Sequence, residues 1–147
     1  MKKVLAVASG GGHWVQLLRL RPAFEHHDVV FMTTNADYAK DVQAKVLSVT
    51  DANIWEKVKL LRMFLEVFFH MLRVRPDVVI TTGAAPGFAA VLFGRMLGAR
   101  TVWVDSIANS EELSNSGKKV RRFAHLWLTQ WEHLSQPAGP HFWGAVL

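Results

Sequence analysis

A glycine-rich segment near the start of the chain ends on a histidine that is suited to proton transfer. Gly10, Gly11 and Gly12 follow a short apolar run, and His13 comes next, ahead of a segment with helical periodicity. Glycines between a strand and a helix let backbone N–H groups approach a bound group closely, and the helix N-terminus favours negative charge. The same helix end disfavours a charged imidazolium, so a neutral His13 is a candidate base for a hydroxyl nucleophile. The segment therefore predicts an anion site, with phosphate as the natural ligand, beside a general base.

Less specific interpretations of this segment stay open. The glycines are equally consistent with a tight turn that binds nothing, because Val15 stands where the dinucleotide fingerprint requires its third glycine and the P-loop Lys-Ser/Thr pair is missing. His13 is one of seven histidines and can also simply cap the helix or hydrogen-bond a neighbouring loop. No histidine pair has the spacing of a zinc site, so we expect neither a metal nor a cofactor.

Two later segments, 81–87 and 105–110, also follow apolar runs. The first opens a predicted helix with small residues, which suits a second anion-binding turn or close helix-to-sheet packing. The second begins with Asp105, whose carboxylate can orient a sugar hydroxyl, polarise His13 or cap the next turn. The candidate catalytic residues are thus His13 and Asp105. The candidate substrate-binding residues are Ser9, Gly10, Gly11, Gly12, Thr82, Gly83, Gly87, Ser106 and Asn109.

The elements that must position these residues alternate along the chain. Apolar runs predict six strands, at 3–8, 28–33, 45–49, 77–82, 100–104 and within 118–130. Helices are predicted at 14–24, 36–43, 54–73, 88–97 and again within 118–130. Such alternation buries both apolar faces only as a mostly parallel sheet with helices on each side. The predicted fold class is α/β, a Rossmann-like doubly wound sheet of about six strands, in one domain over residues 1–147. Ligands of such sheets bind beyond the carboxyl ends of the strands, where the candidate segments and residues 33–37 lie.

Composition narrows the class of protein further. The chain has 147 residues, a formal net charge of +5 and no cysteine, which excludes disulfides, thiolate catalysis and cysteine-based metal sites. Positive charge favours an anionic partner. A mean hydropathy of +0.14, with nine Phe and six Trp, fits a membrane surface better than nucleic acid, so we expect no nucleic-acid partner. The first apolar run is too short for a signal peptide.

The long helix predicted at 54–73 is apolar on more than one side. Its charged residues occupy a narrow sector, so one apolar side can cover the sheet while another meets lipid or protein. The charges interrupt it too often for a membrane span, and we expect it to lie at the membrane surface; burial between the sheet and a neighbouring helix is the alternative. Tryptophans in 125–147 suit a partner surface or the packing of the last strand. The expected membrane or partner contacts are Trp55, Phe64, Phe68, Met71, Trp131 and Trp143.

An ordered set of motifs along the chain resembles a known family. The motifs are residues 9–13 (SGGGH), 75–83 (RPDVVITTG), 105–108 (DSIA), 116–118 (SGK), 129–131 (TQW) and 143–146 (WGAV). Together they are similar to the asparagine-linked glycosylation fourteen-like family, which includes bacterial exopolysaccharide subunits that form one half of a split GT-B glycosyltransferase. A more distant resemblance is to the acceptor half of the peptidoglycan enzyme that makes lipid II. Asp105 stands where many relatives have Glu.

The resemblance implies the N-terminal, acceptor-side half of a GT-B enzyme, which recruits a soluble partner that binds the donor. The implied reaction is an inverting, metal-independent transfer from a UDP-sugar, of glucuronate or N-acetylglucosamine type, to a polyprenyl-diphosphate-linked acceptor in polysaccharide biosynthesis, with His13 as base. It also implies activity only in the complex and a peripheral, monotopic location on the cytoplasmic face of the plasma membrane. A non-catalytic membrane scaffold for a soluble glycosyltransferase and a free-standing nucleotide-binding Rossmann module stay open as alternatives.

Overall fold

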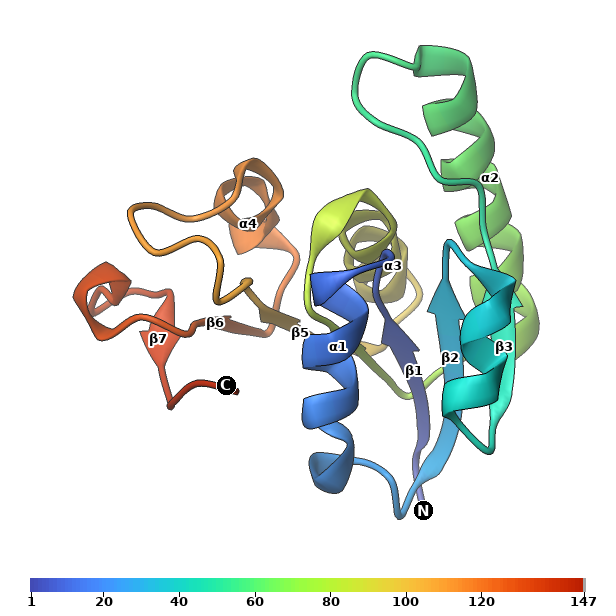
Figure 1. Ribbon diagram of the computed structural model, residues 1–147, viewed down its shortest axis with the longest axis horizontal. Coiled ribbons are helices and arrows are strands. Elements are labelled where there is room, and N and C mark those ends of the chain that lie inside the picture. Colours follow the sequence, from blue (N-terminus) through green and yellow to red (C-terminus); the bar gives the residue numbers. More distant parts are fainter. Residues whose placement is uncertain (147) are drawn as a thin grey trace.

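A seven-stranded, entirely parallel sheet runs through the computed structural model, which describes residues 1–146 (Figure 1). The strands are β1 (Lys3–Val7), β2 (Asp28–Thr33), β3 (Lys45–Ser48), β4 (Val78–Thr81), β5 (Arg100–Val104), β6 (Leu126–Thr129) and β7 (His141–Phe142). Their order is β3-β2-β1-β4-β5-β6-β7. The chain moves outward from β1 to β3 and then returns to β4 on the other side of β1, so the sheet is doubly wound, with its switch point between β1 and β4. The predicted α/β class is confirmed.

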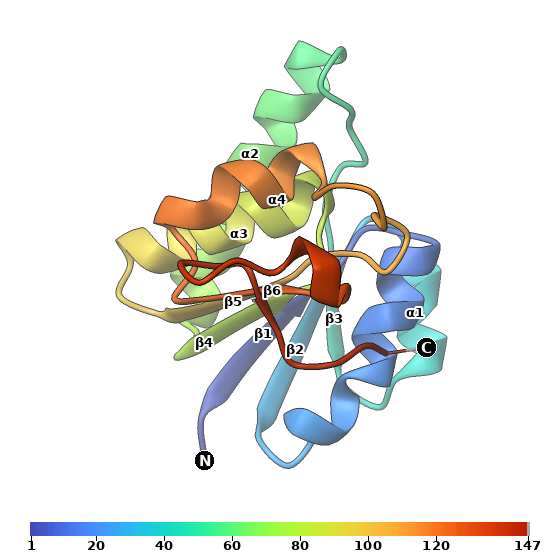
Figure 2. The same ribbon diagram turned by 90° about the vertical axis from the view of Figure 1, so that its left-hand side faces the viewer.

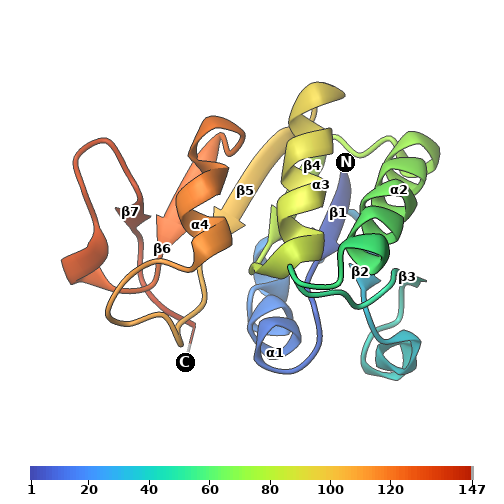
Figure 3. The same cartoon turned by 90° about the horizontal axis from the view of Figure 1, so that it is seen from above.

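Helices connect the strands and cover both faces of the sheet. The α-helices are α1 (Gly12–Arg19), α2 (Lys57–Val74), α3 (Ala84–Met96) and α4 (Asn115–Lys119); short 3₁₀ turns are η1 (Arg21–Ala23), η2 (Ala36–Asp41), η3 (Val120–Arg122) and η4 (Glu132–Leu134). Figure 2 shows α2, α3 and α4 on one face, with α1 and the C-terminal segment on the other. Seen along the strands, the sheet extends from β7 at one edge to β3 at the other (Figure 3).

Alternating side chains of β1 belong to two different cores. Leu5 and Val7 pack with the apolar residues of α2 and α3, whereas Val4 and Ala6 pack with those of α1. All four are buried, because helices cover both faces of the central strand. A strand in this position carries apolar residues throughout and shows no polar alternation, which is why the run at 3–8 identified it.

Small residues let α3 approach the sheet closely. Ala90 and Gly94 are buried on its inner side. A Cβ added at Gly94 would lie 2.9 Å from Val79 Cγ2 and 3.3 Å from Thr101 Cγ2, so the backbone of the helix rests directly on two β-branched side chains of the sheet. These side chains have little rotamer freedom and cannot move aside easily.

Several elements differ from the sequence prediction. The first helix ends at Arg19 and not at 24, α3 begins at Ala84 and not after Gly87, and α4 lies at Asn115–Lys119, ahead of most of the range 118–130. The two-residue strand β7 was not predicted, because a run that short carries no periodicity. The helix expected at 36–43 is the 3₁₀ turn η2. The long helix begins at Lys57 and not at 54, because the Asn53 side chain accepts hydrogen bonds from the N–H groups of Trp55 and Glu56 and thereby forms a turn ahead of it.

Replacing Gly94 by alanine should destabilise the fold. The added methyl group has no room against Val79, and overpacking of this kind costs roughly 1–3 kcal/mol. Chemical denaturation monitored by circular dichroism measures the change. Gly12→Ala is the matched control: a Cβ there meets nothing within 4 Å, so stability should stay the same or rise slightly. Equal stability of the two variants would contradict the close packing of α3.

Candidate functional site

The predicted site segments meet at the carboxyl end of the sheet, around the switch point. β1 and β4 are neighbours, so the loops that follow them lie side by side. The first loop turns through Gly11, whose φ of +66° is a conformation that glycine adopts without strain, and α1 begins at the next residue. The second loop turns through Gly83, with a φ of +125°. Both loops therefore need glycine at the point where the chain leaves its strand.

Two hydrogen bonds fasten His13 to the second loop. The Thr82 hydroxyl donates to the His13 carbonyl oxygen at 2.6 Å, and His13 Nδ1 lies 3.0 Å from the Thr82 carbonyl oxygen. A carbonyl oxygen can only accept, so Nδ1 carries the hydrogen and Nε2 of the neutral ring has a lone pair. The imidazole also packs on Gly83, where a Cβ would lie 3.2 Å from His13 Cε1. The arrangement holds one tautomer, with Nε2 available to take a proton.

Two predicted substrate-binding residues of the second loop lie beneath the site. Thr82 is fully buried, and its polar groups are engaged with His13. Gly87 is buried against the Thr81 side chain, which leaves no room for a Cβ. The Thr81 hydroxyl in turn donates to the Val7 carbonyl oxygen at 2.7 Å. These residues build the support on which His13 rests.

Asp105 is buried, and it organises the loop after β5. Its Oδ1 accepts hydrogen bonds from Trp103 Nε1 at 3.0 Å and from the Ser114 hydroxyl at 2.6 Å, and its Oδ2 accepts from the Ser114 N–H at 3.0 Å. The Ser114 hydroxyl then accepts from the Gly117 N–H and caps α4. Among residues 1–146, no hydrogen bond joins Asp105 to His13. The sequence left three roles open for Asp105. This geometry matches the third, in which the carboxylate caps a turn.

A buried pair of glutamines connects the remaining loops; Gln130 belongs to the motif at 129–131, whereas Gln16 was not identified from the sequence. Gln16 donates from Nε2 to the Ser106 hydroxyl at 3.1 Å and accepts at Oε1 from the Ile107 N–H at 3.1 Å and from Gln130 Nε2 at 2.7 Å. Gln130 Oε1 accepts from the Val146 N–H at 2.8 Å. The pair therefore connects α1, the loop after β5, the end of β6 and the C-terminal segment. The signals in the sequence were Gln130 in the motif at 129–131 and a polar residue, Gln16, next to Leu17 in an otherwise apolar helix face.

The glycine-rich loop itself is open towards solvent. Gly11 and Gly12 are exposed, Ser9 and Gly10 are half-buried, and no side chain caps the start of α1 among the described residues. The half-buried Asn109 belongs to the loop after β5, where its N–H donates to the Ser106 carbonyl oxygen. Within residues 1–146 no three side chains of metal-binding type lie together.

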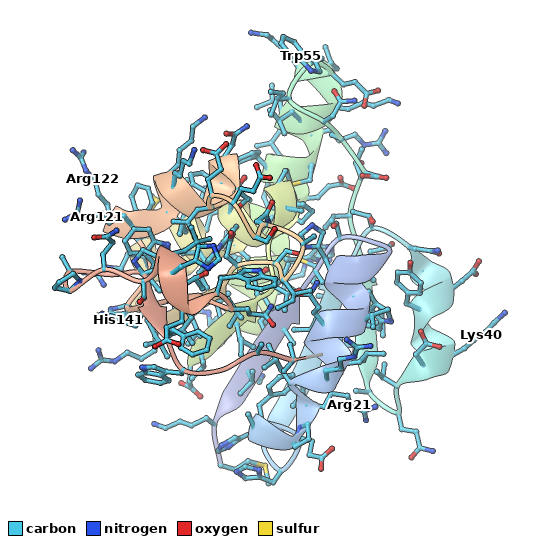
Figure 4. The ribbon with its side chains drawn as sticks, turned by 60° about the vertical axis from the view of Figure 1, so that its left-hand side comes forward. Arg21, Lys40, Trp55, Arg121, Arg122 and His141 are labelled. Atoms are coloured by element: carbon cyan, nitrogen blue, oxygen red, sulfur yellow. The ribbon has the colours of Figure 1, made fainter. Side chains whose placement is uncertain are left out.

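The outward face of α2 carries a row of exposed apolar side chains, which we call the apolar stripe: Val58, Leu61, Leu65, Phe69 and Leu72. Their spacing of three and four residues places them along one side of the helix. The first turns of α2 project past the carboxyl edge of the sheet, and Trp55, which is 83% exposed, lies at the tip (Figures 1 and 4). No helix in the part of the chain that the structure describes is long and apolar enough to cross a bilayer.

The predicted contact residues divide between surface and core. Trp143 is exposed like Trp55, whereas Phe64 and Phe68 are half-buried and their rings pack edge-on against Phe93 of α3. Trp131 is also half-buried, with its indole N–H donating to the Ile107 carbonyl oxygen at 2.7 Å.

The prediction that Met71 contacts a membrane or partner is wrong. Met71 is fully buried in the core beneath α2, because the helix is rotated so that Met63, Val67 and Met71 face the sheet. The apolar stripe lies on the opposite side of α2, so its residues, and not Met71, are the exposed apolar residues of this helix.

Solved structures with the same fold include enzymes that act on nucleotide sugars. The chain superimposes over its full length on 46% of the MurG chain from Acinetobacter baumannii, with a TM-score of 0.82 and 16% identity. It also covers 40% of a UDP-GlcNAc 2-epimerase from Neisseria meningitidis (87% of this chain, TM-score 0.64, 11% identity) and 36% of a glycosyltransferase from Rickettsia africae (88% of this chain, TM-score 0.61, 14% identity). The chain thus spans less than half the length of these proteins and has the fold of the N-terminal half of a GT-B enzyme.

A family model identifies the family to which the chain belongs. The model described as "Oligosaccharide biosynthesis protein Alg14 like" matches residues 43–146, which is more than two thirds of the chain and includes the segments around Thr82 and Asp105. A comparison with curated proteins gave no match. The family resemblance seen in the ordered motifs is therefore confirmed, and the chain belongs to the Alg14-like family of oligosaccharide biosynthesis proteins.

Proposed function

We propose that this chain is the acceptor-side, membrane-associated subunit of a two-component inverting glycosyltransferase in polysaccharide biosynthesis. The complex transfers a sugar from a UDP-sugar, of glucuronate or N-acetylglucosamine type, to a polyprenyl-diphosphate-linked acceptor. One observation carries the proposal: His13 presents Nε2 at the switch point of a GT-B half-fold in a member of the Alg14-like family. Ligands of doubly wound sheets bind at this point.

In this proposal His13 is the general base. A hydroxyl of the acceptor sugar gives its proton to Nε2 while its oxygen attacks the anomeric carbon of the donor. The bond between that carbon and the UDP oxygen breaks, UDP leaves with the bonding electron pair, and the configuration inverts. The Thr82 carbonyl oxygen, 3.0 Å from Nδ1, stabilises the positive charge that the imidazole acquires. Asp105 serves the reaction as a positioning residue, through the loop that it holds.

The glycine-rich loop supplies the place for a diphosphate. The N–H groups in the first turn of α1 lack a capping side chain, and the loop that precedes them is exposed. Such groups, at the positive end of a helix, favour phosphate oxygen atoms. Ser9 to Gly12 and the half-buried Asn109 would line the cleft for the acceptor diphosphate or the donor, and the buried Gly83 and Ser106 would support it from below.

A partner subunit would supply the donor-binding half. The chain corresponds to less than half of MurG, and a GT-B active site lies between two Rossmann-like halves. The exposed Trp143 lies in the C-terminal segment and offers an aromatic contact for such a partner. We propose that activity requires this complex.

The apolar stripe would hold the subunit on the cytoplasmic face of the plasma membrane. Exposed cationic side chains, Lys57, Lys59, Arg62 and Arg73, lie on the same helix and suit anionic lipid headgroups. Trp55 is at the tip that projects beyond the carboxyl edge of the sheet (Figure 4). His13, at the start of α1, follows β1 at the same edge. A lipid-linked acceptor would then approach His13 from the membrane in which its polyprenyl chain is embedded.

Loss of the His13 ring should abolish transfer without unfolding the chain. The test uses the complex with the donor-binding partner, isolated by co-purification with the product of the neighbouring gene and assayed with a panel of UDP-sugars and a lipid-linked acceptor. His13→Asn can keep the hydrogen bond to the Thr82 carbonyl oxygen but has no basic nitrogen, so we expect turnover to fall about 10²- to 10⁴-fold. His26→Ala, at an exposed histidine, is the control. Near-parental turnover of His13→Asn would contradict the assignment of the base.

Removing the apolar stripe should release the chain from membranes. In Leu61→Ser/Leu65→Ser/Phe69→Ser, three exposed side chains lose the apolar area that would enter the lipid, and vesicle affinity should drop at least about tenfold. Flotation with phosphatidylglycerol/phosphatidylethanolamine vesicles measures it. The control Val15→Ser/Met96→Ser/Leu97→Ser changes three exposed apolar residues on other helices. If both triple variants float like the parent, the stripe is not the membrane contact.

Asp105→Asn should act on stability. An amide at this position replaces one acceptor oxygen by a donor that faces the Ser114 N–H or hydroxyl, and leaving such a buried group unpaired costs about 1–3 kcal/mol. Thermal unfolding measures the loss. An Asn variant as stable as the parent, but inactive in the complex, would instead indicate that the carboxylate acts directly in the reaction.

A further inference from the structure

The glycine-rich loop is contacted by a side chain that the proposed mechanism does not use. Tyr38 lies in η2, directly after residues 33–37, and its hydroxyl accepts a hydrogen bond from the Gly11 N–H at 3.0 Å. It is the only tyrosine of the chain. The contact joins the segment after β2 to the turn between β1 and α1, across 27 residues of sequence.

Packing fixes the place of the Tyr38 ring. The ring stacks on Trp14 of α1, with centroids 4.9 Å apart and an angle of 8° between the planes. Trp14 is buried, and its indole N–H donates to Asp41 Oδ2 at 2.9 Å. Because η2 supplies both Tyr38 and Asp41, the turn is docked on α1 at two points. The phenol hydroxyl therefore has little freedom to move away from the loop.

The glycine-rich loop has few other contacts that define its conformation. Gly11 carries no side chain and adopts φ +66° and ψ −133°, and no side chain caps the helix that follows. A Cβ at Gly10 would lie 3.2 Å from the Tyr38 hydroxyl oxygen, so the phenol packs against the backbone of two consecutive glycines. Glycine peptides have the largest conformational freedom in a chain. Without the hydroxyl, the Gly11 peptide loses the side-chain partner that orients it.

We propose that Tyr38 is a positioning residue for the glycine-rich loop. Its hydroxyl holds the orientation of the Gly11 peptide and thereby the start of α1, where the uncapped first-turn N–H groups and His13 lie. Tyr38 acts through the loop and does not touch the substrate. The inference rests on the proposed function only in naming the bound group as the diphosphate of the lipid-linked acceptor; the hold on Gly11 does not depend on it.

Tyr38→Phe tests this because it keeps the stacking on Trp14 and removes only the hydroxyl. We expect the Gly11 amide to exchange with solvent roughly five- to tenfold faster in the ¹⁵N-glycine-labelled chain, the change that one neutral hydrogen bond produces, while the other glycine amides stay as they were. In the complex, kcat/KM for the polyprenyl-diphosphate acceptor should fall by a similar factor, and KM for the UDP-sugar should stay unchanged. Ser135→Ala removes an exposed hydroxyl that donates to the Glu132 carbonyl oxygen, and serves as the control.

Several results would overturn the proposal. One is unchanged exchange of the Gly11 amide in a folded Tyr38→Phe chain; another is an equal rise for all glycine amides, which indicates general destabilisation. If Tyr38→Phe does not fold, the unsubstituted chain decides: its Gly11 amide must exchange at least about tenfold more slowly than that of the exposed Gly12. Equal exchange rates of the Gly11 and Gly12 amides would contradict a hydrogen bond that holds the Gly11 peptide. A complex that transfers no sugar while Gly11 is protected counts against the proposed function and leaves the role of Tyr38 in the loop intact.

Discussion

The paired hydrogen bonds between His13 and Thr82 are the interaction on which the candidate site depends. They join the loop after β1 to the loop after β4, the two neighbouring strands between which the order of strand addition reverses. Because one of the bonds uses Nδ1 and a carbonyl oxygen, it sets the tautomer of the ring as well as its position. A single contact between two loops thus decides which nitrogen of the histidine can act as a base.

The surrounding structure serves to keep this pair in place. The buried Gln16 and Gln130 fix α1 to the loops after β5 and β6, and the stacked Trp14 and Tyr38 fix the other side of the same helix. His13 lies at the start of a helix that is only eight residues long and buries few core residues of its own. The contacts of Gln16 and Trp14 therefore fix the position of this helix. Among the described residues, no side chain caps the first-turn N–H groups of α1. Rigid support beside open donors is what a site for an anionic ligand requires.

The sequence predicts six of the seven strands and the position of His13 because both depend on local patterns. Continuous apolar runs mark strands buried on both faces, and the glycines mark the turn after β1. The rotation of α2 could not be predicted: apolar residues cover most of its circumference, and only the docking against α3 and the sheet decides that Met71 is buried and Leu65 exposed. The roles of Thr82 and Tyr38 depend on contacts with residues 69 and 27 positions away in the sequence, which no local pattern reports.

The tautomer of His13 decides whether Nε2 can act as the base. Long-range ¹H–¹⁵N correlation spectra of the chain labelled with ¹⁵N-histidine, with His13→Asn used to assign the signal, distinguish the protonated from the unprotonated ring nitrogen. The hydrogen bond to the Thr82 carbonyl oxygen predicts that the neutral form of the His13 ring carries its hydrogen on Nδ1 and a lone pair on Nε2. A His13 ring protonated on Nε2 alone, or a population divided equally between the two tautomers, would contradict it.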